Sequence, residues 1–240
     1  ESCLKWLDTY GIDKQDVLGI GIGVPGPVTA KGVVNRCVNL GWGRFNIHEE
    51  LGKRTGLPVK AGNDANVAAL GEAWKGGGKG FENMVMVTLG TGVGGGTIVG
   101  LSKQILGISD IDHLISLAET GDIEKIDLRI GDITKKDLGG LPSYMTASNF
   151  GKLDDMATKN DLALGIVNMV FESIGMLAVF AARSKKTRDV VLTGNLSKMP
   201  QAVPIFEILS QMFDMNFVIP KNSEFATVIG AALAEFENEI

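Results

Sequence analysis

Short apolar runs alternate along the chain with longer segments in which apolar residues recur at helical spacing. The short runs end at glycine, proline or polar residues, as buried strands do, and they lie at 17–24, 58–61, 84–89, 189–192 and 216–219. Helical spacing predicts a helix that ends near Gly11 and further helices at 46–55, 64–74, 101–106, 110–118, 158–183, 203–213 and 224–236. Strands that alternate with helices predict an α/β fold.

Glycine is the residue type whose usage departs most from the average. It supplies 32 of 240 residues, about twice the usual ~7%, and its positions follow no repeat. Many glycines lie where the apolar runs end, which predicts loops that let a ligand approach the backbone closely. Hydrophobic residues make up 45% of the chain and charged residues 21%, which excludes a disordered chain and leaves material for a core.

Charge, cysteine content and hydropathy narrow the possible partners. The net charge is −5 and basic residues are scattered apart from a group at 183–188, so we expect no nucleic-acid partner. Cys3 and Cys37 are too few for a disulfide framework or a four-thiolate zinc site, and they fit a reducing cytoplasm. No apolar run reaches the ~18 residues of a membrane span, and the first residues show no signal-peptide pattern. The sequence therefore predicts a cytoplasmic protein without a membrane segment.

One group of residues has the residue types of a metal site. Asp110, Asp112 and His113 lie close together in the sequence. Acidic residues favour the first turn of a helix, so we interpret this group as a solvated helix start and assign no metal ligands.

The segment 84–96 joins an apolar run to the glycine-rich sequence GTGVGGG. Glycines leave backbone amides open to a phosphate, and Thr88 and Thr91 add hydroxyl groups. The segment is not a P-loop, because no Gly-Lys-Ser/Thr follows, and it lacks the acidic residue of a dinucleotide-binding fingerprint. A phosphate-binding loop is the favoured interpretation, and a purely structural glycine-rich hairpin is the alternative.

Asn63 and Asp64 lie at the junction between an apolar run and a predicted helix. A carboxylate in that place can accept a proton from a substrate hydroxyl. It can equally serve as a helix cap, and one residue can do both.

Three further loops follow apolar runs. The turns at 24–28 and 39–42 are rich in proline and glycine, and they either have a structural role or bind a polyol through Asn39 and free backbone groups. The loop at Gly194 and Asn195 either lets a nucleotide base lie against the backbone or is a plain strand-to-helix turn.

Residues from the first helix to about 96 resemble the ROK family of repressors, open reading frames and sugar kinases, and bacterial glucokinases in particular. The resemblance is carried by GIGVPGPV, VNLGW, GNDANVAALGE and LGTGVGGG. It implies the actin-like ATPase (ribonuclease H-like) fold of the superfamily of acetate and sugar kinases, heat-shock chaperones and actin. Two α/β domains, here 1–83 and 84–240, would surround a cleft that holds ATP and sugar. The resemblance also implies that Asp64 is the general base on the sugar 6-hydroxyl.

The chain from about residue 90 onward resembles type II pantothenate kinases instead. The carriers are GGGTIVGLS, GISDID, GDIEKIDL, ASNFG and the long helix that leads to VVLTGN. The sugar-binding His and Glu and the cysteine-rich zinc loop of the glucokinases have no counterpart, and neither do the Glu base and the Arg of the pantothenate kinases. We interpret the chain as a chimera or composite of the two families.

Both families open with an Asp-x-Gly-Gly-Thr hairpin that positions magnesium and the γ-phosphate. The sequence contains no such motif. We therefore expect a truncated first domain and weak or absent turnover.

The function favoured by these resemblances is ATP-dependent transfer of the γ-phosphate to a hexose hydroxyl, with ATP and Mg²⁺ as cofactors. A type II pantothenate kinase of coenzyme A biosynthesis and a catalytically silent nucleotide-binding or engineered scaffold protein are the alternatives. A homodimer formed through the long apolar helix is a further expectation. The expected site residues are Asp64 as the base; Pro25, Gly26, Asn39, Asn63 and Asp64 for the substrate; and Gly90, Thr91, Gly92, Gly94, Gly194 and Asn195 for ATP.

Overall fold

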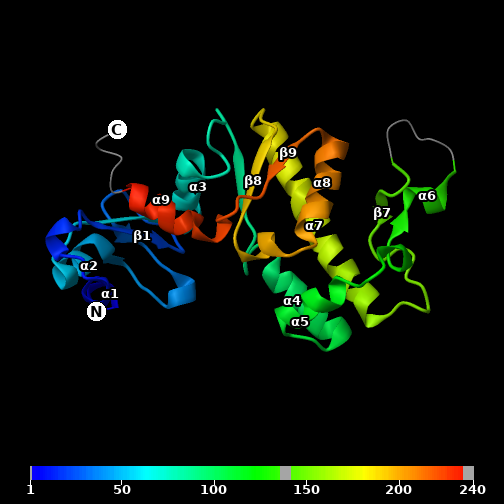
Figure 1. The fold of residues 1–240 in the computed structure, drawn as a ribbon, viewed down its shortest axis with the longest axis horizontal. Coiled ribbons are helices and arrows are strands. Elements are labelled where there is room, and N and C mark those ends of the chain that lie inside the picture. Colours follow the sequence, from blue (N-terminus) through cyan, green and yellow to red (C-terminus); the bar gives the residue numbers. More distant parts are fainter. Residues whose placement is uncertain (1, 136–141, 235–240) are drawn as a thin grey trace. The chain divides into compact units, whose positions relative to one another are not determined.

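The computed structural model describes residues 2–135 and 142–234 (Figure 1). It divides the chain into two compact units, one formed by Glu1–Phe81 together with Asn222–Ile240 and the other by Glu82–Lys221. The boundary predicted after residue 83 lies close to this division. The predicted second domain includes the last helix, however, and the structure places that helix in the first unit.

The first unit is built on two parallel strands, β1 (Ile20–Val24) and β4 (Val59–Asn63). Their register places Val24 beside Asn63, so the carboxyl ends of both strands meet at one edge of the sheet. The unit also contains an antiparallel pair of strands, β2 (Val33–Val34) with β3 (Phe45–Asn46). Its α-helices are α1 (Ser2–Tyr10), α2 (Ile47–Thr55), α3 (Asp64–Lys75) and α9 (Ala226–Ala234). Three short 3₁₀ helices, labelled η, are η1 (Lys14–Asp16), η2 (Val38–Leu40) and η5 (Ser223–Phe225).

Helix α9 belongs to the first unit because glycines let it lie very close to α3 and β1. A Cβ on Gly71 of α3 would lie only 2.8 Å from the backbone nitrogen of Gly230 on α9. Gly21 of β1 likewise leaves no room for a side chain against the carbonyl group of Ala231. Helical periodicity in the sequence does not reveal such a long-range contact, which is why the predicted domain boundary assigned this helix to the second domain.

The second unit holds a three-stranded parallel sheet in the order β5 (Val85–Thr88), β8 (Asp189–Thr193), β9 (Asn216–Val218). Helix α7 (Lys159–Ser184) is its longest element, and its Ile166, Val167, Phe171 and Val179 side chains are fully buried in the core. The elements that pack against α7 include α4 (Gly95–Leu106), α5 (Ile111–Ala118) and α8 (Ala202–Phe213).

Helix α7 is long and apolar enough, by length and composition, to cross a membrane. This corrects the expectation that no apolar segment of the chain reaches that length. In the structure 61% of its most apolar stretch is buried inside the protein, as in the core helix of a globular domain. A capping box begins the helix, because Thr158 Oγ1 accepts from the Asp161 amide and Asp161 Oδ2 accepts from the Thr158 amide at 2.8 Å.

Between α5 and α7 the chain forms several short elements, η3 (Ile123–Lys125), α6 (Ile130–Ile133) and an antiparallel pair of β6 (Leu128–Arg129) with β7 (Thr146–Ser148). Asp127 ties this layer to α7 although its side chain is completely buried. Its Oδ1 accepts from the Phe150 amide and its Oδ2 accepts from Asn168 Nδ2 of α7, both at 2.8 Å. A buried carboxylate is tolerated here because each oxygen has a donor.

Candidate functional site

The carboxyl ends of β1 and β4 bring together four of the predicted substrate residues. Pro25 and Gly26 continue from β1, while Asn63 ends β4 and Asp64 begins α3. Ligands of parallel α/β sheets bind outside the carboxyl ends of the strands. This edge is therefore the candidate substrate site of the first unit.

Asn63 links the two loops of this site. Its Oδ1 caps α3 by accepting from the Asn66 amide at 3.2 Å, and its Nδ2 donates to the Gly26 carbonyl oxygen at 3.3 Å. The same Nδ2 lies 3.1 Å from Asp64 Oδ1. Asn63 rather than Asp64 is thus the helix cap, which corrects the alternative reading of Asp64 as the capping residue.

The carboxylate of Asp64 is half-buried at the first position of α3. Its Oδ1 accepts from the Ala65 amide at 2.9 Å as well as from Asn63, and no hydrogen bond from the described residues reaches Oδ2. The partial positive charge of a helix N-terminus stabilises a carboxylate in this place. One oxygen is therefore held in position while the other remains available to accept a proton.

The turn after β1 is fixed by a residue to which the sequence assigned no function. Cys37 is buried, and its Sγ donates to the Pro25 carbonyl oxygen at 3.1 Å. Gly26 packs so close to the following loop that a Cβ would lie 2.9 Å from the Arg36 carbonyl oxygen. Asn39 lies in η2, two residues beyond Cys37, and its side chain falls outside the described residues.

The second unit presents a separate candidate site at the carboxyl ends of its parallel strands β5 and β8. The hydroxyl groups of Thr88 and Thr193, which end these strands, lie 3.1 Å apart. The predicted glycine-rich segment follows β5 as a tight turn in which Gly90 and Val93 exchange backbone hydrogen bonds of 3.2 Å. The sequence placed Thr88 and Thr193 in two separate loop motifs and did not predict their contact, because only the pairing of the two strands brings these hydroxyls together.

The glycine-rich turn leads directly into helix α4, whose N-cap is Gly94 with φ +94°. The helix begins at Gly95, whereas helical spacing predicted a start at 101, because the glycines at its first turn carry no periodic apolar side chains. The amides of Gly95 and Gly96 donate to the carbonyl oxygens of Gly90 and Thr91 at 2.9 Å. A helix N-terminus thus lies where the phosphate loop was predicted.

Gly90 and Gly92 border open space. A Cβ built on either residue would meet no atom within 4 Å. These two glycines are therefore not required by contacts within the protein. Their open surface is the feature that a ligand approaching the backbone needs.

The loop after β8 lies directly against the glycine-rich turn. Gly194 has φ +89°, and its position beside Leu89 excludes a side chain. The amide of Leu196 donates to the Leu89 carbonyl oxygen at 3.2 Å, so Asn195, the first residue of η4 (Asn195–Lys198), lies next to the end of β5. All the residues predicted to bind ATP thus gather at one edge of the second unit.

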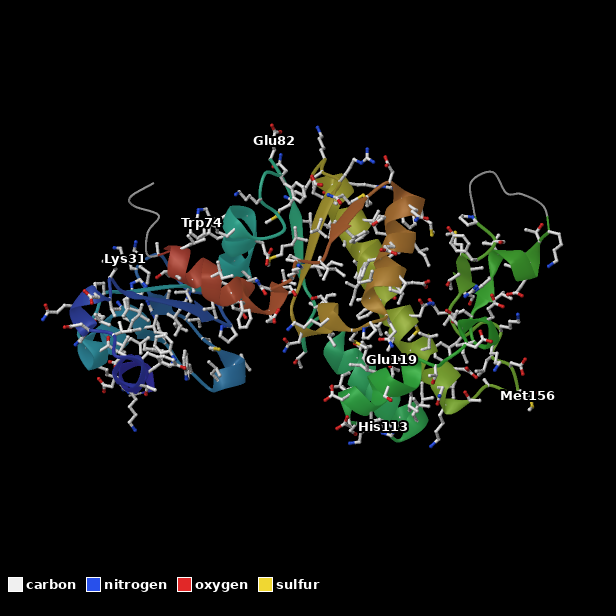
Figure 2. All side chains as sticks on the ribbon, viewed as in Figure 1. Lys31, Trp74, Glu82, His113, Glu119 and Met156 are labelled. Carbon is white, nitrogen blue, oxygen red and sulfur yellow. The ribbon has the colours of Figure 1, made fainter. Side chains whose placement is uncertain are left out.

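The described residues hold no group of three or more His, Cys, Asp or Glu side chains that could bind a metal ion. Asp110 instead caps α5, and its Oδ1 accepts from the His113 amide at 2.8 Å. The side chain of His113 lies at the surface of the unit (Figure 2).

Two solved structures show which class of protein has this fold. A ROK family glucokinase from Streptomyces griseus, solved in complex with glucose and AMPPNP, matches 97% of this chain and 86% of its own with a TM-score of 0.62 at 17% identity. A ROK family protein from Streptococcus pneumoniae, solved in complex with sucrose, matches 99% and 86% with a TM-score of 0.68, also at 17% identity. The chain therefore has the actin-like ATPase fold of the ROK sugar kinases, as the resemblance implied.

Two family models match the chain over different, overlapping segments. The ROK family model matches residues 5–109, and the Fumble model matches residues 81–217, which is more than half of the chain. The chain belongs to the Fumble family, and its first part is similar to the ROK family model.

Curated relatives divide in the same way. A glucokinase from Halalkalibacterium halodurans is 43% identical over 122 residues, which are 49% of this chain and 37% of the relative. A type II pantothenate kinase from Oceanobacillus iheyensis is 32% identical over 148 residues, which are 60% of this chain and 56% of the relative. The chain thus spans less than two thirds of the length of either relative.

Proposed function

We propose that the chain acts as an ATP-dependent phosphotransferase that transfers the γ-phosphate to a hexose hydroxyl. The observation that carries the proposal is the arrangement at the end of β4. Asp64 has one oxygen held by Asn63 and by the Ala65 amide, and its other oxygen is open. This arrangement suits a general base that removes the proton of a hydroxyl while the hydroxyl attacks a phosphate.

The substrate residues have complementary roles in this proposal. Asn63 and the Gly26 backbone form a hydrogen-bonded pair beside the base, and they would orient the hydroxyl groups of a sugar. Pro25 and Asn39 belong to the neighbouring loops, which Cys37 connects. Glucose is the first substrate to test because a glucokinase is among the relatives that match this part of the chain.

ATP would bind at the glycine-rich edge of the second unit. Gly90, Thr91, Gly92 and Gly94 would border its phosphates in the turn before α4, where Gly90 and Gly92 leave open space beside the backbone. Gly194 and Asn195 would border the nucleotide from the adjoining loop. Mg²⁺ commonly binds through nucleotide phosphates and water with few protein ligands, so it would arrive with ATP.

The test is release of ADP from ATP by the full chain, first with glucose and then with pantothenate. Glucose-dependent release supports the proposal. Release with pantothenate alone supports the second candidate below. If neither substrate raises ADP release but ATP raises the melting temperature, the chain is a nucleotide-binding protein without this activity.

A type II pantothenate kinase is the second candidate. The match to the Fumble model over more than half of the chain favours it, together with the identity to a type II pantothenate kinase over 148 residues. In this case Asp64 would still be the available carboxylate at the substrate edge of the first unit. The two substrates in the assay above separate the candidates.

We further propose that the chain forms a homodimer. Leu177 and Phe180 lie one helical turn apart on α7 and are 69% and 59% exposed. Large exposed apolar side chains that lie close together on a helix are typical of a protein contact. Light scattering coupled to size-exclusion chromatography should give twice the 25.5 kDa chain mass, and a Leu177→Glu, Phe180→Glu variant should give the single mass.

A further inference from the structure

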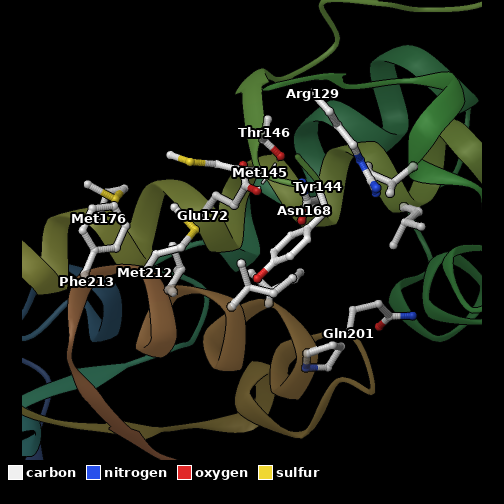
Figure 3. Close-up of a pocket in the computed structure, with 16 residues that line it drawn as sticks. Arg129, Tyr144, Met145, Thr146, Asn168, Glu172, Met176, Gln201, Met212 and Phe213 are labelled. Atoms are coloured by element: carbon white, nitrogen blue, oxygen red, sulfur yellow. Dashed lines mark hydrogen bonds between the residues drawn. The ribbon is translucent and has the colours of Figure 1, made fainter. Parts of the chain in front are cut away.

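The second unit holds a cavity of about 450 Å³ beside helix α7 (Figure 3), and its described lining includes no residue of the glycine-rich edge. Helices α7 and α8 and the segment that includes β7 form its walls. The volume falls within the ~300–1,000 Å³ that is typical of small-molecule sites. Its apolar lining includes Leu164, Met176, Ile205, Ile208, Leu209 and Phe213.

Asn168 of α7 gives this apolar cavity an unpaired hydrogen-bond acceptor. The residue is only 8% exposed, and its Nδ2 donates to Asp127 Oδ2 at 2.8 Å. A carboxylate can only accept, so this bond fixes the orientation of the amide and turns Oδ1 to the other side. None of the described donors bonds to Asn168 Oδ1, and Asn168 lines the cavity.

Glu172 lies one turn further along α7 and adds a negative charge to the same wall (Figure 3). Its Oε1 accepts from Thr146 Oγ1 and its Oε2 accepts from Asn149 Nδ2, both at 2.8 Å. Asn149 Nδ2 also reaches Asp127 Oδ2 at 3.4 Å, so a single amide connects two carboxylates. Within the described parts of the chain, neither carboxylate forms an ion pair.

Cationic charge within the cavity is already compensated. Arg129 is the guanidinium that lines the described cavity, and its Nη1 pairs with Glu124 at 3.0 Å.

Gln201, at the start of α8, supplies a second unpaired acceptor. It is 6% exposed, its Nε2 donates weakly to the Ile115 carbonyl oxygen at 3.4 Å, and its buried Oε1 has no donor. The unpaired side-chain atoms of Asn168 and Gln201 in this cavity are therefore acceptors, and Glu172 is the carboxylate among its described lining residues.

We propose that this cavity binds a small organic cation, namely a primary ammonium group on an apolar body. The N–H groups of the ammonium donate to Asn168 Oδ1 and to the Glu172 carboxylate, and the hydrocarbon part lies against the apolar side chains of α8. A carboxylate beside an apolar wall favours a cationic partner, and hydrogen bonds between ionised groups are the stronger ones. A carboxylate ligand is repelled, and a neutral alcohol supplies only one donor.

The proposal is tested by isothermal titration calorimetry of the full chain at pH 7 with three probes of equal apolar size. Hexylammonium, 1-hexanol and heptanoate share a hexyl chain and differ only in their head groups. Hexylammonium is expected to bind at least about tenfold more tightly than 1-hexanol, which corresponds to ~1.4 kcal/mol, and heptanoate is expected to show no binding. Equal affinity for the three probes, or no binding of hexylammonium, overturns the proposal.

Substitutions of residues in the cavity test whether hexylammonium binds there. Glu172→Gln keeps groups that can bond to Thr146 and Asn149 but removes the charge, so the preference for hexylammonium over hexanol should fall about tenfold. Ile208→Trp should fill the cavity and abolish binding of hexylammonium. Val203→Trp is the matched control, because Val203 lies on the same helix, is 48% exposed and does not line the cavity.

A second copy of the chain is the competing occupant of this surface. If Ile208→Trp disrupts self-association but leaves hexylammonium binding unchanged, the cavity belongs to a protein contact and the ligand proposal is wrong. If Ile208→Trp abolishes hexylammonium binding while the mass in solution stays the same, the ligand proposal is supported.

Discussion

Asn63 Nδ2 lies 3.1 Å from Asp64 Oδ1, and this contact joins the end of β4 to the start of α3. The asparagine also caps the helix through its Oδ1 and contacts the Gly26 carbonyl oxygen. The aspartate is therefore relieved of the capping role, and one of its oxygens remains open.

Asp64→Asn should slow catalysis strongly without unfolding the chain. The asparagine Oδ1 can still accept from the Ala65 amide, so the loss of stability should be limited to about 0.3–1 kcal/mol of helix-dipole energy. A general base contributes roughly 10²–10⁴-fold to the rate, so kcat should fall by that factor. Steady-state ADP release and thermal unfolding measure both effects.

Asp110→Asn is the matched control for this substitution. Asp110 is also a carboxylate at a helix N-terminus, where its Oδ1 accepts from the His113 amide. The control should keep full activity. Equal loss of activity in both variants would assign the effect of Asp64→Asn to a general change in the protein.

Gly92→Ala should weaken ATP binding without disturbing the fold. The added Cβ meets no protein atom within 4 Å, so it would occupy the open space that a phosphate needs. The dissociation constant for ATP should rise at least about tenfold, or ~1.4 kcal/mol, in isothermal titration calorimetry. Gly100→Ala, which also has open space but lies inside α4, should leave ATP binding unchanged and raise stability by roughly 0.5–1 kcal/mol.

Glu72 should destabilise the first unit when it is ionised. Burial raises the pKa of its carboxyl group above 4.5, and the hydrogen bond from the Gly77 amide only partly offsets this. For an acid with a raised pKa, the stabilising contribution is present below the unfolded value and disappears as the pH rises through the folded value. At pH 7 the free energy of unfolding of Glu72→Gln, measured by urea denaturation, should therefore equal or exceed that of the wild type. As the pH falls toward 4, the wild type should gain stability relative to Glu72→Gln, because Glu72 becomes protonated.

Glu72→Ala separates the charge from the hydrogen bond. It removes the acceptor of the Gly77 amide, so it should cost about 1–3 kcal/mol at pH 7. A Glu72→Gln variant that is as unstable as Glu72→Ala would show that the charged form itself is required.

Asp161 should contribute to acid unfolding. Burial raises the pKa of its carboxyl group, but bonds from the Thr158 amide, the Asp122 amide and the Thr158 hydroxyl, together with Lys125, outweigh burial and lower it from 3.8 to about 2. For an acid with a lowered pKa, the stability is present above the unfolded value and is lost as the pH falls through the folded value. The wild type should therefore lose stability between pH 4 and pH 2 as Asp161 becomes protonated. Asp161→Asn has no carboxylate to protonate, so its stability should fall less over this pH range than that of the wild type, as followed by circular dichroism.

The sequence predicts most of the elements because each apolar run or periodic segment carries its own local signal. The runs at 84–89 and 189–192 correspond to β5 and β8, and the segment 158–183 corresponds to α7. The first turn of α4 is not predicted from the sequence, because its glycines have no side chains that could show a helical period. The placement of α9 is not predicted either, because the contact of Gly71 with Gly230 joins positions far apart in the sequence.

The parts of the candidate sites that are local in the sequence are predictable, as they are for the fold. Asp64 and the glycine-rich segment stand out because a carboxylate and a run of glycines at strand ends are local features. That Asn63 caps the helix while Asp64 keeps a free oxygen can be seen only from the geometry of the helix start. The roles of Cys37 and Thr193 need pairings between distant segments, which a single sequence does not specify.

The most direct test of the central claim is mass-spectrometric measurement of phosphorylated hexose after incubation of the full chain with ATP, Mg²⁺ and glucose, beside Asp64→Asn. The account predicts phosphorylated glucose from the wild-type chain and a yield at least about a hundredfold lower from the variant. Equal yields from the two proteins, or no phosphorylated glucose from the wild type, would contradict it.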